Sequence, residues 1–292
     1  MAKKLGILYS QLRDDEKALI EAARQAGAEP VLLKAEEAVF DLQDGRVIAP
    51  GAVDVVIERT VDHFVALYSL MLFERAGVRT VNTSDVARIC GDKLLTTLAF
   101  QEAGVPTPRT QVAFSSETAL QAIEELSYPA MLKPLTGDKR ALVARLNDFD
   151  AAKAVLEHKD RLGQYDHSIY YLQEFLQNRP GRDIRAFVVG NEVVKAVYVI
   201  ANKATSSAGL NQTVIECPLT PEIIEVALAA AQAVGGGVLA VDLIEDGDRL
   251  VAIEVDYTIE MSALDLAAEL APRIIAYALA EPLGEYETDI TD

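Results

Sequence analysis

Apolar and polar positions alternate in two different rhythms over the first ninety residues. Apolar runs of strand length occur at 5–10, 30–35, 53–60 and 78–82. Between them, residues 15–28 and 63–76 carry apolar side chains at helical spacing. Strands separated by helices of about ten to fifteen residues are typical of βαβ units. The pattern therefore predicts an N-terminal α/β domain with a parallel sheet.

The order of elements changes after residue 82. A helix is predicted to begin at 82–84 and to continue to Gly104, and Pro106 and Pro108 then mark a boundary. The next part of the chain predicts a small α+β unit, followed by a strand-rich part. The expected strands are 111–114, 129–135, 141–146, 169–176, 183–190, 192–200, 238–246 and 250–258, and the expected helices are 115–126, 148–162, 220–236 and 262–279. An irregular polar stretch is expected between 200 and 220, and a loose acidic tail over 281–292.

Charge and cysteine content restrict the classes of function. The formal net charge is −18, from 27 basic and 45 acidic residues, which argues against binding the polyanionic backbone of DNA or RNA. No apolar run approaches the roughly eighteen residues of a membrane span. Cys90 and Cys217 have neither a disulfide-framework nor a metal-ligand spacing. We therefore expect a cytoplasmic protein that binds neither nucleic acid nor membrane.

Three carboxylates on strand-like segments form a candidate cation site. Glu254 and Asp256 lie two apart on one expected strand, so their side chains point to the same face. A hairpin at 246–248 would bring Asp242 beside them. Carboxylate oxygens suit Mg²⁺, and a charge on an apolar strand is costly unless it is paired or binds metal. The alternative, that this strand face is simply exposed to solvent, stays open on spacing alone.

The segment LKPLTGDKRALVAR at 132–145 has the position of a phosphate loop between two strands. Such loops usually contain several small residues, because backbone N–H groups must face the phosphate oxygens. This segment offers one glycine, Gly137, followed by Asp138, Lys139 and Arg140.

Several motifs together resemble the ATP-grasp ligases, in the branch of RimK and LysX, with the LysX type more similar. These motifs are CGDK at 90–93, PAMLKP at 129–134, YYLQEFLQNRPGRDIRAFVVG at 170–190, ECPLTPE at 216–222, AVGGGVLAVDLIED at 233–246 and EVD at 254–256. The resemblance implies an α/β and α+β architecture with the ATP-grasp fold. It implies a Rossmann-like domain over 1–90, a central lid over 91–176, an antiparallel-sheet domain over 177–280 and an acidic tail over 281–292.

The resemblance also implies site residues. ATP and Mg²⁺, with Mn²⁺ as an alternative, are the expected cofactors. Lys93 and Lys133 match the two family lysines that reach the phosphates, and Gly137 lies in the phosphate loop. The hinge residues, whose backbone contacts adenine in the family, match Gln173, Glu174, Phe175 and Leu176. Asp183 lies where the family has an acid that contacts ribose. The implied metal ligands are Asp242, Glu254 and Asp256, and Lys139, Arg140 and Arg185 are candidate catalytic cations.

The sequence departs from the family pattern at positions that concern the phosphates. The loop at 136–140 lacks the usual glycines and serine. Val199 and Ile200 stand where relatives carry arginines, and Ser207 and Leu210 stand where relatives carry asparagine and arginine. Asp256 replaces an asparagine. Loss of a cation that stabilises a transferring phosphoryl group costs about 10³-fold or more in rate.

Two functions follow from the resemblance. The first is an ATP-dependent carboxylate–amine ligase, in which ATP phosphorylates a carboxylate and an amine attacks the acyl phosphate. Its expected partners are a small-molecule or protein-terminal carboxylate and an amino acid, and the family implies a homo-oligomer, either dimer or tetramer. The alternative is a nucleotide-binding or interaction protein that kept the fold and lost turnover. An acidic carrier protein would be repelled by this acidic chain, because no basic cluster is apparent in the sequence.

Overall fold

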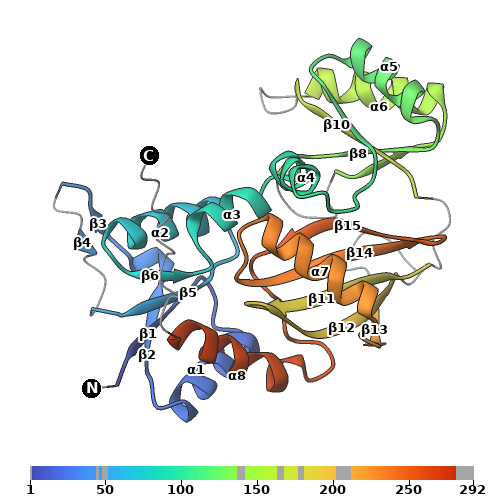
Figure 1. Ribbon diagram of the computed structural model, residues 1–292. Coiled ribbons are helices and arrows are strands. Elements are labelled where there is room, and N and C mark those ends of the chain that lie inside the picture. Colours follow the sequence, from blue (N-terminus) through green and yellow to red (C-terminus); the bar gives the residue numbers. More distant parts are fainter. Residues whose placement is uncertain are drawn as a thin grey trace, which may run out of the picture.

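Three main sheets, each formed by a separate part of the chain, organise the molecule (Figure 1). The structure is a computed structural model that describes residues 2–43, 46–47, 52–136, 142–162, 168–176, 181–201 and 212–280. None of the helices in these ranges is long and apolar enough to cross a membrane.

The N-terminal sheet is parallel, as predicted. Its strands are β1 (Lys4–Tyr9), β2 (Glu29–Lys34), β5 (Val55–Arg59) and β6 (Arg79–Val81), in the order β2-β1-β5-β6. Helices α1 (Asp14–Gln25) and α2 (His63–Arg75) supply the crossovers. The chain leaves β1 and β5 toward opposite edges of the sheet, so the carboxyl ends of these two strands flank a switch point where ligands commonly bind. Three short elements were not predicted: η1 (Ala35–Glu37), β3 (Phe40–Asp41) and β4 (Arg46–Val47).

The continuous helix predicted from residue 82 to Gly104 is wrong. The chain forms two helices, α3 (Ser84–Cys90) and α4 (Lys93–Glu102), which are separated at Gly91 and Asp92. The Asp92 side chain caps α4 by accepting hydrogen bonds from the backbone N–H groups of Leu94 and Leu95, at 2.8 and 3.2 Å. The break matters because it places Lys93 at the beginning of a new helix.

A small antiparallel sheet forms the central unit. Its strands are β7 (Thr110–Ala113), β8 (Ala130–Lys133), β9 (Ala144–Leu146) and β10 (Tyr170–Glu174), in the order β7-β10-β8-β9. Helices α5 (Ser116–Leu126) and α6 (Phe149–Leu162) pack on it through a shared cluster of buried side chains that includes Ile123, Leu156 and Leu172. The unit thus has a core of its own, and α4 leads into it (Figure 1).

The C-terminal sheet is antiparallel and has five strands. They are β11 (Asp183–Val189), β12 (Glu192–Ala201), β13 (Gln212–Cys217), β14 (Val238–Asp246) and β15 (Arg249–Asp256), in the order β13-β12-β11-β14-β15. Helix α7 (Pro221–Ala233) packs against it with an almost wholly apolar face. Strand β13 falls in the stretch that was expected to be irregular, so that prediction is wrong there. It is an edge strand with one neighbour, and Gln212, Thr213 and Glu216 hide its periodicity.

The last helix joins the two ends of the chain. Helix α8 (Leu266–Leu279) packs against α1, and their apolar side chains form one buried cluster with residues of the N-terminal sheet and of β11, such as Ile7 and Phe187. It therefore lies between the N-terminal and C-terminal sheets (Figure 1). The loop from β15 to α8, which follows the carboxylates of β15, is held between the same two parts.

Candidate functional site

Two lysines lie at the junction of the central unit and the C-terminal sheet. Lys93 begins α4, and its Nζ lies 3.1 Å from Oε1 of Glu254 on β15. The backbone N–H of Lys93 donates to the carbonyl of Leu135 at 2.9 Å, two residues after Lys133 at the end of β8. The Asp92 cap and the contact with Leu135 thus bring the backbone of Lys93 close to the end of β8, where Lys133 lies.

A buried chain of hydrogen bonds positions Lys133. Its Nζ donates to Oε1 of Gln173 on the neighbouring strand β10, at 2.6 Å. The amide of Gln173 donates to the Tyr171 hydroxyl at 3.2 Å, and that hydroxyl lies 2.7 Å from Oγ1 of Thr97 on α4. Burial raises the pKa of Tyr171, so its hydroxyl stays protonated in this chain. The lysine is therefore connected to the helix that begins with Lys93.

The three predicted carboxylates do lie together on the β14–β15 hairpin. Asp242 is the register partner of Glu254, and Ala240 is the partner of Asp256, so the turn predicted at 246–248 aligns the two strands as expected. A β-bulge follows Asp242 in this ladder. The alternative of a freely solvated strand face does not describe the site, because each carboxylate contacts a cation.

Arg185 on β11 is the centre of this cluster. Its Nε and Nη2 donate to the two carboxylate oxygens of Asp242 at 2.7 and 2.8 Å, and Nη2 lies 3.3 Å from Oδ2 of Asp256. Burial acts to lower the pKa of Arg185, but the negative charges of Asp242 and Asp256 outweigh it and raise the pKa. The bidentate geometry is the strong form of an arginine–carboxylate pair.

The carboxylates have the right chemistry for a hard divalent cation. All three donors are oxygen ligands of the kind that Mg²⁺ accepts. Over the ranges that the structure describes, however, no group of three or more His, Cys, Asp or Glu side chains is arranged to hold a metal ion. Arg185 and Lys93 neutralise these carboxylates instead. A metal at this site would have to share the carboxylates with both cations.

The four hinge residues have distinct surroundings. Gln173 is buried, and the backbone N–H of Glu174 donates to the carbonyl of Arg109 at 2.9 Å, so that N–H is already used. The guanidinium of Arg145 lies over the ring of Phe175, with its Cζ atom 4.0 Å from the ring centroid. Leu176 packs in a small cluster with side chains of β14 and β15. The hinge therefore connects the central and C-terminal sheets.

Other predicted positions are only partly described. Asp183 begins β11 opposite Val199 on β12, and Ile200 is paired with Thr213 on β13. Val199 packs with the buried cluster around α8. Gly137, Asp138, Lys139 and Arg140 lie outside the described residues, as do Ser207 and Leu210.

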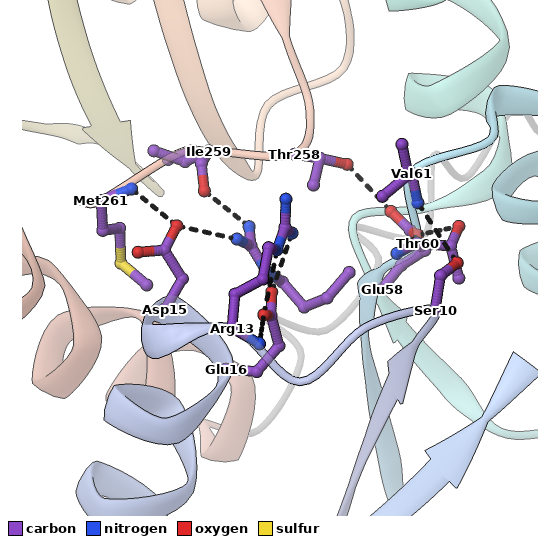
Figure 2. A network of polar contacts seen from close by, with 11 residues as sticks. Ser10, Arg13, Asp15, Glu16, Glu58, Thr60, Val61, Thr258, Ile259 and Met261 are labelled. Carbon is purple, nitrogen blue, oxygen red and sulfur yellow. Dashed lines mark hydrogen bonds and ion pairs between the residues drawn. The ribbon is translucent and has the colours of Figure 1, made fainter.

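A polar network that the sequence did not reveal holds the loop after β15 to the N-terminal sheet (Figure 2). Arg59, at the end of β5, donates to Oε1 of Glu16 at 3.0 Å, to Oδ2 of Asp15 at 3.2 Å and to the carbonyl of Ile259 at 2.6 Å. The same Asp15 oxygen accepts the N–H of Met261 at 2.8 Å. The apolar side chains of Ile259 and Met261 are buried, so both ends of this short segment are fixed.

A second set of contacts holds the beginning of the same loop. Glu58 accepts from the Thr258 hydroxyl at 2.9 Å and from the Thr60 hydroxyl at 2.5 Å (Figure 2). The Tyr257 hydroxyl lies 2.9 Å from Nδ1 of His63 at the start of α2. Burial raises the pKa of Glu58 and of Tyr257 and lowers that of His63. All three shifts favour neutral groups beside the loop.

Asn82 adds a third attachment. Its side-chain amide donates to the carbonyls of Val238 and Tyr257, both at 2.7 Å, and its Oδ1 accepts the N–H of Val238 at 2.6 Å. Gly237 makes this close approach feasible, because a Cβ there would lie 2.1 Å from Oδ1 of Asn82. The N-terminal domain therefore fixes the position of the loop at 257–261, which directly follows the carboxylate-bearing strand β15.

Comparisons with known proteins show which family and which structures the chain resembles. Residues 90–278 match a family model described as the RimK-like ATP-grasp domain, and residues 5–89 match the LysX preATP-grasp domain. The chain is 32% identical to an alpha-aminoadipate–LysW ligase LysX of Sulfurisphaera tokodaii, over 84% of this chain and 86% of the relative. It is 33% identical to a glutamate–LysW ligase ArgX of the same organism, over 69% and 72%. A crystal structure of a RimK domain protein from Sphaerobacter thermophilus superposes with a TM-score of 0.79 at 25% identity, over 95% of this chain and 100% of that one.

Proposed function

The chain belongs to the RimK-like ATP-grasp family of carboxylate–amine ligases, which use ATP with a divalent metal, and we propose that it joins an acidic amino acid, through its amine, to a small-molecule or protein-terminal carboxylate. The names of the two relatives support the choice of amine, since one relative acts on α-aminoadipate and the other on glutamate. Membership favours the ligase over a nucleotide-binding protein without turnover.

One observation supports the assignment of the site. Nζ of Lys93, which we propose binds phosphate, lies 3.1 Å from Oε1 of Glu254 in the carboxylate cluster. A site for triphosphate and a divalent cation would need both kinds of group side by side, because carboxylates would hold the cation and a lysine would bind the phosphates. We assign Lys93 and Lys133 to the phosphates, and Asp242, Glu254 and Asp256 to Mg²⁺.

The remaining proposed roles come from the match to the family motifs. The backbone of 173–176, apart from the Glu174 N–H that already donates to Arg109, would contact adenine, and Asp183 would contact ribose. The bound metal would neutralise charge on the phosphates during transfer. Arg185, on β11, contacts Asp242 on the adjacent strand β14 and Asp256 on β15, and so orients two of the three proposed ligands. The loop at 257–261 would line the site of the amine substrate, since it follows Asp256 directly.

Calorimetric titration with ATP, with and without Mg²⁺, tests this assignment. We expect magnesium-dependent binding that is lost in both Asp242→Ala and Lys133→Ala. Asp248→Ala, in the exposed turn of the same hairpin, and Lys153→Ala, on the exposed face of α6, are the matched controls and should bind as the wild type does. Binding that ignores the first two variants, or no binding at millimolar ATP, would contradict the proposed site.

A further inference from the structure

His63, the first residue of α2, contacts two distant segments of the chain. Its Nδ1 atom lies 2.9 Å from the hydroxyl of Tyr257, and the two rings meet edge to face with centroids 5.9 Å apart. Its ring also packs against Gly91, in the turn between α3 and α4. The start of α2 is itself fixed, because the Asp62 side chain accepts hydrogen bonds from two backbone N–H groups of the first turn, both at 2.9 Å. The N-terminal domain therefore holds a half-buried imidazole against both segments.

The glycine at position 91 is required by this ring and not by its backbone conformation. Gly91 has a φ of −76° and a ψ of −8°, which are right-handed helical values that residues with a side chain adopt readily. A Cβ at Gly91 would, however, overlap three ring atoms of His63, namely Cε1, Nε2 and Nδ1. The imidazole therefore lies directly on the backbone of the turn, and the two residues fit as a pair.

The turn at Gly91 controls where Lys93 lies. The next residue, Asp92, caps α4, and Lys93 begins that helix. Nζ of Lys93 lies 3.1 Å from Oε1 of Glu254, and the lysine is buried. A buried side chain has little freedom to compensate for a shift of its own backbone, so a displacement of the turn would change this distance.

The contact with Tyr257 acts on the other side of the same site. Tyr257 directly follows Asp256 at the end of β15, and its carbonyl accepts a hydrogen bond from the Asn82 amide at 2.7 Å. Burial raises the pKa of Tyr257 and lowers that of His63, so the phenol and the imidazole are both uncharged at neutral pH and form a neutral hydrogen bond. His63 thus contacts the chain two residues before Lys93 and one residue after Asp256.

We propose that His63 is a positioning residue of the ATP site, which sets the separation of Lys93 from the carboxylates of β15. It acts through its contacts with Gly91 and Tyr257. The inference deepens the proposed function and rests on it, because that function assigns Lys93 to the phosphates. A misplacement of about 1 Å in such a site can cost about 100-fold in rate. The same ring accounts for a glycine between α3 and α4 where the backbone does not need one.

A double-mutant cycle between His63 and Gly91 tests this fit. Calorimetry with ATP and Mg²⁺ measures the dissociation constant of each folded variant. Gly91→Ala should weaken ATP binding by about 10-fold or more, because the new methyl group and the imidazole cannot both be accommodated. Addition of His63→Ala removes the overlap, so the double variant should bind ATP more tightly than Gly91→Ala alone. Gly77→Ala, just after α2, is the matched control, because its Cβ meets nothing within 4 Å, and it should bind ATP as the wild type does.

A conservative variant separates positioning from a contribution to stability alone. His63→Ala should weaken ATP binding by about 3–10-fold, whereas His63→Asn, whose amide can still hydrogen-bond the Tyr257 hydroxyl, should bind within about twofold of the wild type. Urea unfolding followed by circular dichroism gives the stability of each variant. A purely structural role would lower the stability and leave the affinity of the folded protein unchanged. If Gly91→Ala does not fold, the two His63 variants decide the question.

Failure of this inference differs from failure of the proposed function. The inference is overturned if the wild type binds ATP and both His63→Ala and Gly91→Ala bind it equally well. It is also overturned if the double variant binds no more tightly than Gly91→Ala, or if His63→Asn binds as weakly as His63→Ala. A wild type that binds no ATP would overturn the proposed function, and the role of His63 with it.

Discussion

Replacement of Arg59 by alanine tests how the N-terminal domain holds the loop at 257–261. The Arg59 side chain is 5% exposed, and its two acidic partners, Asp15 and Glu16, are 8% and 0% exposed. The variant removes three hydrogen bonds and leaves two buried carboxylates short of a cation. Glu16 retains its contacts with Arg13, at 2.8 and 3.0 Å, so the loss falls mainly on Asp15 and on the carbonyl of Ile259.

The expected cost follows from that geometry. Removal of one partner of a buried ion pair destabilises a protein by about 3–5 kcal/mol, a large part of a total stability of about 5–15 kcal/mol. Arg59→Lys retains the charge without the planar fork and should cost about half as much. Urea unfolding followed by circular dichroism measures both values, since the chain has no Trp for fluorescence. Arg273→Ala is the control, because its two bonds to Glu192 are exposed and should contribute at most about 1 kcal/mol.

The pH dependence gives a second readout. Burial acts to raise the pKa of Glu16, but the hydrogen bond from Arg13 and the charge of Arg59 outweigh it, and the pKa is lowered. An acid with a lowered pKa stabilises the fold above its ordinary pKa and loses that contribution as the pH falls. Arg59→Ala should therefore lose less stability on acidification than the wild type does. This role of Arg59 would be refuted if Arg59→Ala lost no more stability than Arg273→Ala does and if its stability fell at acidic pH as steeply as that of the wild type.

Three further predictions concern Gly237, Glu58 and Lys93. Gly237→Ala should destabilise the protein by about 2–4 kcal/mol in thermal unfolding, because the new methyl group displaces Asn82. Gly236→Ala is the control: its methyl group meets nothing within 4 Å, so it should destabilise the protein by only about 1 kcal/mol, from backbone strain. Burial raises the pKa of Glu58, so the stability of the wild type falls as the pH rises through that pKa. Glu58→Gln should therefore be more stable than the wild type at neutral pH and equally stable at acidic pH, as measured by urea unfolding at both pH values. Lys93→Met should weaken ATP binding by about 10–100-fold in calorimetry, and an unchanged affinity would exclude a phosphate contact.

Local sequence patterns were enough for most elements and for the carboxylate hairpin. Strand periodicity and the turn at 246–248 placed Asp242 beside Glu254, and the register of β14 and β15 confirms it. The break between α3 and α4 was missed because the apolar pattern continues across it. The helix-capping position of Asp92 was the signal that could have revealed the break.

Long-range contacts could not be predicted in this way. Arg59 and Ile259 are separated by 200 positions, and Arg185 and Asp242 by 57. No local periodicity encodes a partner at that distance, because the pairing depends on how sheets and α8 pack. The acid pair at 15–16 and the Glu-Arg dipeptide at 58–59 were a partial signal, since charges at the end of a buried strand or on a buried helix face need partners.

The central claim is that the chain activates a carboxylate with ATP and transfers it to an amine. The most direct measurement supplies a carboxylate substrate labelled with a heavy oxygen isotope, together with glutamate or another amino acid and ATP, and follows the label by mass spectrometry. We predict that ADP and phosphate form in equal amounts only when acid and amine are both present, and that one labelled oxygen appears in the phosphate. ADP release that is independent of both substrates, or phosphate without label, would contradict an acyl-phosphate ligase.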